Sequence, residues 1–139
     1  MTKLPDESQY APEIAIGRVI ARLPDSVEVL FRKMMREPRR SREELRRLVA
    51  AHLVRLETLA REVDYLDVEL AAEVANRCHR LIDTIDPPVS EDHRRLVQAA
   101  VLYFVLDEDV EGDTTSLIGL DDDRLVVVAV CDELGARIT

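Results

Sequence analysis

Apolar side chains recur every three or four residues along most of the chain, a period typical of helices that bury one face. The longest such stretch runs over 41–63, where the apolar stripe lies opposite arginines and glutamates. Ser41 and Glu44 have the spacing of a capping box, which marks the first turn of a helix. The sequence therefore predicts a helix here, whose stripe consists of Leu45, Leu48, Val49, His52, Leu56, Leu59, Ala60 and Val63.

Prolines and capping residues divide the part of the chain before residue 41 into two predicted helices. The apolar residues within 14–23 predict a short helix that Pro24 ends, because the residue before a proline avoids helical geometry. Asp25, followed by Glu28 three residues later, predicts a capping box for the next helix. Residues 1–12 have no period and are expected to form a loose N-terminal arm.

The same signals continue after the long helix. Asp64 or Asp67 is expected to cap a helix whose apolar face extends to Ile85. Ser90 predicts the start of another, which is apolar on all sides over 99–106. A helix without a polar face is expected at the centre of a bundle.

The last segment, 121–134, contains a run of β-branched residues that propensity alone assigns to a strand. No other segment alternates with a period of two to pair with it. Three aspartates over 121–123 and a glycine at position 135 are typical of helix ends, so we predict a buried helix. The expected fold is all-α: a compact bundle of five to six helices, with a central apolar helix hairpin joined by an acidic loop.

Charge is distributed unevenly along the chain. The net charge of −9 at pH 7 disfavours a general attraction to nucleic acids or anionic membranes. Residues 32–47 nevertheless carry a local +5, and residues 105–139 carry a local −8. A solvated helix face is the favoured interpretation of the basic segment 32–47, and a nucleic-acid interface is the less favoured one. Association of opposite ends of two copies is a further alternative, so we expect a protein partner or a homo-oligomer.

Cysteine spacing and hydropathy limit the class of protein. Cys78 and Cys131 form no metal-binding or disulfide pattern and are expected in the core. The first ten residues contain no apolar stretch of the kind found in signal peptides. The longest apolar run, 99–106, is eight residues, against about 20 for a membrane-spanning helix. We expect a cytoplasmic protein with no membrane span.

The segment LDEDVEGDTTSLIGLDDD carries eight carboxylates in 18 residues. Asp107, Asp109, Glu111 and Gly112 match the first half of a calcium-binding EF-hand loop, but the residue at the twelfth position is Ile118, which cannot ligate. The favoured interpretation is a solvated loop leading into a helix. The alternative is a Ca²⁺ or Mg²⁺ site in the acidic loop 107–123, with Asp107, Asp109, Glu111, Asp113 and Asp122 as ligands.

The stretch AAVLYFVLDEDVEGDTTSLIGLDDDRLVVV, residues 99–128, resembles the bacterial YkvA-like family, a domain of unknown function. Asp107 and Gly112 replace two prolines of the family pattern. The resemblance implies a helix–loop–helix over 91–137, within a single domain over 13–139 whose residues 13–90 it does not identify. It implies no enzymatic activity. The matching positions are Tyr103, Phe104, Asp109, Asp113, Gly119, Asp122 and Asp123.

Catalytic motifs are not found in the sequence. No serine lies in a nucleophile elbow, and no phosphate-binding loop occurs. His52 lies on the apolar stripe of its helix, where a core histidine is the favoured interpretation. We therefore expect a non-enzymatic helical domain that acts through protein–protein contacts, with cation binding or, less favoured, nucleic-acid binding as alternatives.

Overall fold

The computed structural model describes residues 12–63, 66–85, 89–106 and 116–135. These residues form an all-α bundle, as the helical period predicts, and no strand occurs among them. The helices are α2 (Pro12–Ala21), α3 (Asp25–Met35), α4 (Arg42–Ala60), α5 (Val68–Asp83), α6 (Glu91–Leu106) and α7 (Ser116–Leu134).

Three helices begin at the capping residues that the sequence indicates. Ser41 Oγ accepts a hydrogen bond from the backbone N–H three residues later, and Asp67 Oδ1 and Ser90 Oγ do the same for α5 and α6. Each of these bonds satisfies an N–H group that has no partner within the helix. Asp67, rather than Asp64, therefore caps α5.

Two predicted helix starts are wrong. The N-cap of α3 is Pro24 and not Asp25, and no side chain caps this helix. Asp25 and Glu28 lie in its first turn, where their negative charge is favourable. Helix α7 begins at Ser116, so the three aspartates over 121–123 lie inside the helix and the acidic loop ends earlier than predicted.

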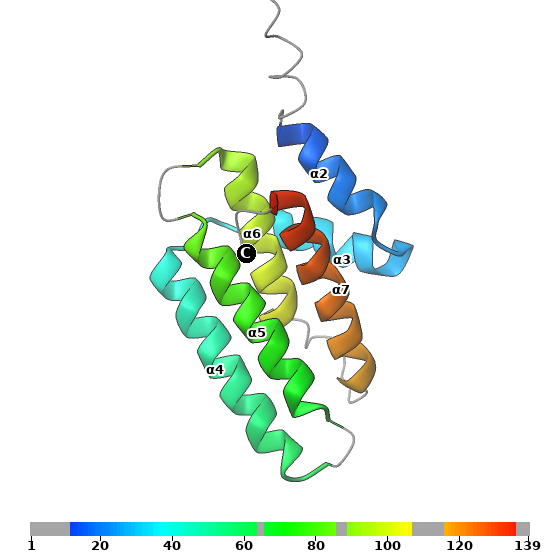
Figure 1. Cartoon of the computed structure of the whole chain (residues 1–139), viewed down its shortest axis with the longest axis vertical. Coiled ribbons are helices and arrows are strands. Elements are labelled where there is room, and N and C mark those ends of the chain that lie inside the picture. The colour runs from blue at the N-terminus through cyan, green and yellow to red at the C-terminus, as the bar shows by residue number, and fades with distance from the viewer. Residues whose placement is uncertain (1–11, 64–65, 86–88, 107–115, 136–139) are drawn as a thin grey trace, which may run out of the picture.

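Helix α6 lies at the centre of the bundle, as its apolar composition predicts (Figure 1). Every residue from Leu96 to Val105 is buried. Helices α4 and α5 pack side by side against it, α7 packs against both α5 and α6, and α2 and α3 cover the remaining sides (Figure 1). Burial of apolar surface around α6 is the main stabilising contribution to such a core.

The core contains few polar groups. Cys78 and Cys131 are buried and unpaired with each other, as predicted. Buried polar side chains belong to His52, Gln98 and Asp123. No helix in the described ranges combines the length and apolar character needed to cross a membrane.

Candidate anion-binding pocket

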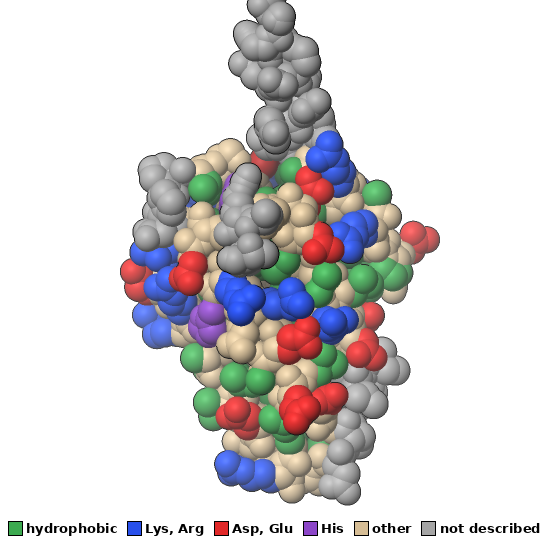
Figure 2. Space-filling view, in the orientation of Figure 1, with side chains coloured by type: hydrophobic (Ala, Val, Ile, Leu, Met, Phe, Trp, Pro, Cys, Tyr) green, Lys and Arg blue, Asp and Glu red, His purple; other side chains and the backbone are tan. Residues whose placement is uncertain are grey.

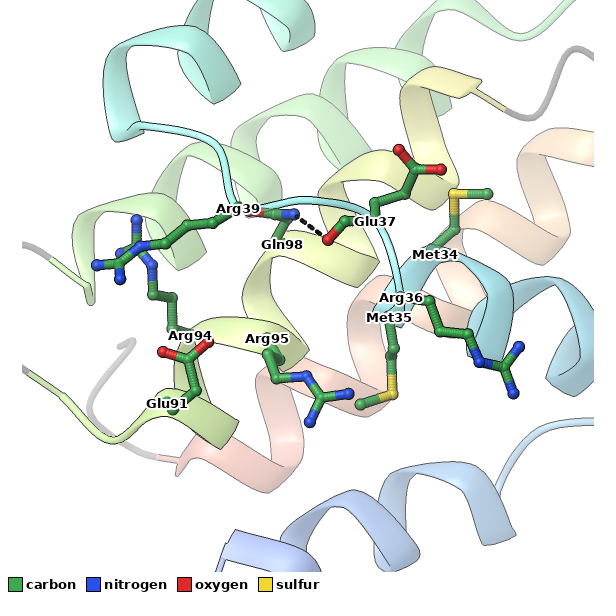
Figure 3. A pocket seen from close by; sticks show the side chains of 9 residues that line it. All are labelled: Met34, Met35, Arg36, Glu37, Arg39, Glu91, Arg94, Arg95 and Gln98. Atoms are coloured by element: carbon green, nitrogen blue, oxygen red, sulfur yellow. Dashed lines mark hydrogen bonds between the residues drawn. The ribbon is translucent and has the colours of Figure 1, made fainter.

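A pocket of about 400 Å³ opens where the segment linking α3 to α4 crosses the first half of α6. The end of α3 and the linker form one wall, and the first two turns of α6 form the other (Figure 3). The lining residues are Met34, Met35, Arg36, Glu37, Arg39, Glu91, Arg94, Arg95 and Gln98.

Gln98 holds the linker in place. Its side chain is only 6% exposed and lies in the buried stretch of α6 that runs from Leu96 to Val105. Its Oε1 accepts a hydrogen bond from the backbone N–H of Arg40 at 2.9 Å, and its Nε2 donates to the carbonyl oxygens of Pro38 at 2.8 Å and Glu37 at 3.4 Å. Buried amides are stable when their polar atoms are bonded in this way. One side chain therefore holds three backbone groups of the linker.

Arg94 provides a second connection and a free donor. Its Nη2 donates to the carbonyl oxygen of Arg40 at 3.1 Å. Its Nε is buried and has no hydrogen-bond partner within the described part of the chain. In Figure 3 the side chains of Arg94 and Arg39 extend to the same side of the pocket. A buried donor without a partner costs free energy, and an anion placed beside it would remove that cost.

Positive charge exceeds negative charge in this pocket. Four arginines and two glutamates line it. The carboxylate of Glu37 pairs with Arg40, which does not line the pocket, at 3.1 Å. Arg36 and Arg39 are both exposed, and neither forms an ion pair with any residue that the structure describes. The excess charge gives the pocket the electrostatics of an anion site.

The pocket also has an apolar part. Met35 is half-buried, and its side chain lies near that of Arg95 in the close view (Figure 3). Arg95 itself pairs with Asp92 at 3.6 Å. Methionine adapts its shape readily and contacts apolar ligand groups well. The pocket can therefore accept an anionic group together with an apolar neighbour.

Elsewhere on the described surface, seven arginines form ion pairs, whereas Arg47, Arg55, Arg61 and Arg80 form none. Acidic and basic side chains are mixed over α5 and α7 in Figure 2. Glu73 of α5 accepts hydrogen bonds from Arg124 at 3.1 Å and from Arg77 at 3.2 Å. The bond from Arg124 is the main reason that the pKa of Glu73 lies below its ordinary value. Charge on this face is compensated locally, unlike that of the pocket.

His52 is a core residue, as predicted. It is 7% exposed, and its ring contacts Phe104 edge to face with centroids 4.8 Å apart. Burial, with a smaller effect of Arg55, lowers its pKa from 6.5 to about 4. The ring is thus neutral at pH 7, and it lies outside the pocket.

Most of the predicted cation ligands lie outside the described residues, namely Asp107, Asp109, Glu111 and Asp113. Asp122 is half-buried on α7, and burial together with Asp121 raises its pKa. Among the residues with described positions, no group of three or more His, Cys, Asp or Glu side chains could hold a metal ion. The cation site stays a prediction.

The basic segment 32–47 forms part of the pocket wall. It supplies Arg36 and Arg39 to the pocket, whereas Arg32 pairs with Glu28 of its own helix at 2.7 Å. Sequence reasoning missed the contribution of α6. The signal available was Gln98, a polar residue directly before the apolar run 99–106 of the helix expected at the centre of the bundle.

Comparison with protein-family models, curated proteins and solved structures gives no match for this chain. The resemblance to the YkvA-like family therefore stays a prediction.

Proposed function

We propose that this chain is a non-enzymatic helical interaction domain of the cytoplasm that binds an acidic segment of a partner protein in the arginine-lined pocket. The observation that carries the proposal is the pair Arg36 and Arg39, whose charges are not compensated by any described acidic residue. Their neighbours in the wall are held by Gln98 and Arg94, so the site is organised before a ligand arrives. Preorganisation reduces the entropy lost on binding.

A protein segment suits this site better than a nucleic acid. The net charge of the chain is −9, so a long polyphosphate would meet repulsion beyond the basic pocket. Charges separated by more than about 8 Å are largely screened at physiological salt. A short acidic peptide would therefore experience mainly the local positive charge. The two methionines favour a ligand that also has apolar side chains.

The lining residues favour binding over catalysis. Apart from Glu37 and Glu91, they include none of the common nucleophiles and proton carriers of enzymes, such as histidine, cysteine, serine or threonine. Arginine binds carboxylates and phosphates through paired N–H groups and stays protonated. Recognition of an anion is the chemistry that these side chains perform.

Peptide binding tests the proposal. A fluorescently labelled peptide rich in glutamate, with one central leucine, should bind the protein and raise the fluorescence anisotropy. The affinity should fall as salt is added. Arg39→Glu should weaken binding by about tenfold or more, because it reverses a charge inside the pocket. Arg61→Glu is the matched control: Arg61 is exposed at the opposite end of α4, about 28 Å along the helix from its start.

The control should bind like the wild type within about twofold. Equal weakening by both variants would show that only net charge matters and would contradict the proposal. Tighter binding of a DNA duplex than of the peptide would favour the nucleic-acid interpretation instead.

A further inference from the structure

We infer that the anionic group recognised in the pocket is a phosphorylated side chain of the partner, a phosphoserine or phosphothreonine, rather than a carboxylate. This inference rests on the proposed function and specifies its ligand. Three features carry it: the amount of uncompensated charge, the arrangement of donors and the size of the pocket.

The uncompensated charge corresponds to a dianion. Glu37 is paired with Arg40, and Arg95 is paired with Asp92, so these two lining residues are already partly neutralised. Three arginines, Arg36, Arg39 and Arg94, then remain with one glutamate, Glu91, which leaves an excess of two positive charges over the whole pocket. Arg39 and Arg94 lie on the side of Glu91, and Arg36 extends to the other side (Figure 3). A phosphoryl group carries about −1.5 to −2 at pH 7, whereas a carboxylate carries −1. The dianion balances the pocket more completely.

The donors suit a group with three acceptor oxygens. Arg94 is anchored through Nη2 to the Arg40 carbonyl, and its Nε–H remains unbonded within the described residues. Arg39 extends to the same side of the pocket and presents a full guanidinium (Figure 3). A phosphoryl group can accept from both arginines and keep an oxygen for a further donor, because it has one oxygen more than a carboxylate. Gln98 of α6 holds the linker that carries Arg39 through the backbone of Pro38 and Arg40.

The volume favours a phosphate attached to a protein. A cavity of about 400 Å³ is much larger than a phosphoryl group, since a single water molecule occupies about 30 Å³ of liquid volume. Met34 and Met35 also line the pocket, and Met35 is half-buried. These side chains can contact the residue that carries the phosphate and its apolar neighbour. Inorganic phosphate would leave this apolar part of the pocket unfilled.

Three labelled peptides of one sequence test the inference, with phosphoserine, glutamate or serine at the central position. The phosphopeptide should bind the wild-type protein about tenfold more tightly than the glutamate peptide, and the serine peptide should bind most weakly. Arg39→Gln should reduce the preference for phosphate to about threefold or less. Arg61→Gln, which removes the same charge from the far end of α4, should keep the full preference. Circular dichroism of each variant verifies that it is folded.

The outcomes separate the inference from the proposed function. Equal binding of the phosphoserine and glutamate peptides would overturn the inference and leave the proposed function standing. Failure of all three peptides to bind would overturn both. Competition by inorganic phosphate at concentrations similar to those of the phosphopeptide would show a site for the free anion. That result would contradict the inference that the phosphate is carried by a protein. Tighter binding of a single-stranded oligonucleotide would overturn the inference as well.

Discussion

Acidification is expected to destabilise the fold through His52. Its ring is buried against Phe104, and its pKa is lowered from 6.5 to about 4. The unfolded chain therefore takes up a proton on this ring near pH 6.5, whereas the folded protein takes it up only near pH 4. The stabilising contribution of the neutral ring is complete above pH 6.5 and is lost progressively as the pH falls from 6.5 towards 4.

The size of this effect follows from the two pKa values. Between about pH 8 and about pH 5, the free energy of unfolding should fall by about 2 kcal/mol because of His52 alone. That is a large part of the roughly 5–15 kcal/mol that stabilises a typical domain. For a chain of 139 residues it corresponds to a decrease in melting temperature of roughly 6–8 °C.

Urea denaturation at about pH 8 and about pH 5 measures the contribution of His52 when the wild type is compared with His52→Phe. Phenylalanine keeps a ring beside Phe104 but cannot bind a proton, so the variant should lose about 2 kcal/mol less than the wild type on acidification. Carboxylates titrate in both proteins, and their contribution cancels in the difference. Arg55→Gln should reduce the pH dependence by a smaller amount, because Arg55 is the lesser cause of the shift. The same pH dependence in wild type and His52→Phe would refute the reasoning.

Three further perturbations test the packing around the pocket and the core. Gln98→Leu should lower the free energy of unfolding by about 2 kcal/mol in urea denaturation, because it leaves the Arg40 N–H and the Pro38 carbonyl without their partner. The control Asn76→Leu, at an exposed position of α5, should change the free energy of unfolding by less than about 0.5 kcal/mol. Ser41→Ala should cost about 1 kcal/mol by removing the cap of α4, and a loss no larger than that of Ser26→Ala at an exposed site would contradict the role of the cap. Burial raises the pKa of both the Cys78 and Cys131 thiols, so iodoacetamide should alkylate the folded protein far more slowly than the urea-unfolded protein; equal rates measured by mass spectrometry would show that the thiols are accessible.

The sequence predicts those parts of the fold that depend on local interactions. Ser41 caps α4 because a hydroxyl at that position bonds a nearby N–H, whatever the rest of the protein does. The apolar run from Leu96 to Val105 places α6 at the centre, because it offers no face to water. Both features depend on neighbours within one helix.

The starts of α3 and α7 depend on more than local signals. Asp25 has the residue type of a cap, but Pro24 takes the N-cap position and leaves the aspartate in the first turn. Asp123 belongs to a triplet typical of a helix start, yet it is 2% exposed inside α7. Asp123 is buried where α7 packs against its neighbouring helices, so the triplet does not mark the first turn.

The pocket could be predicted only in part. Arg36 and Arg39 are visible as members of a basic segment, but their wall is completed by Arg94 and Gln98, more than 50 residues later in the chain. Nothing in the spacing of these residues reveals that α6 crosses the linker at this point. The site results from tertiary packing, which a single sequence does not specify by motif.

A charge exchange between the pocket and its ligand tests the central claim most directly. The affinity of the glutamate-rich peptide should fall by about tenfold or more in Arg39→Glu. A peptide with lysine in place of one glutamate beside the central leucine should recover binding to this variant, and it should bind the wild type more weakly than the original peptide does. Recovery would place the peptide's charged residue beside position 39. Undiminished affinity of the glutamate-rich peptide for Arg39→Glu would contradict the pocket as the binding site.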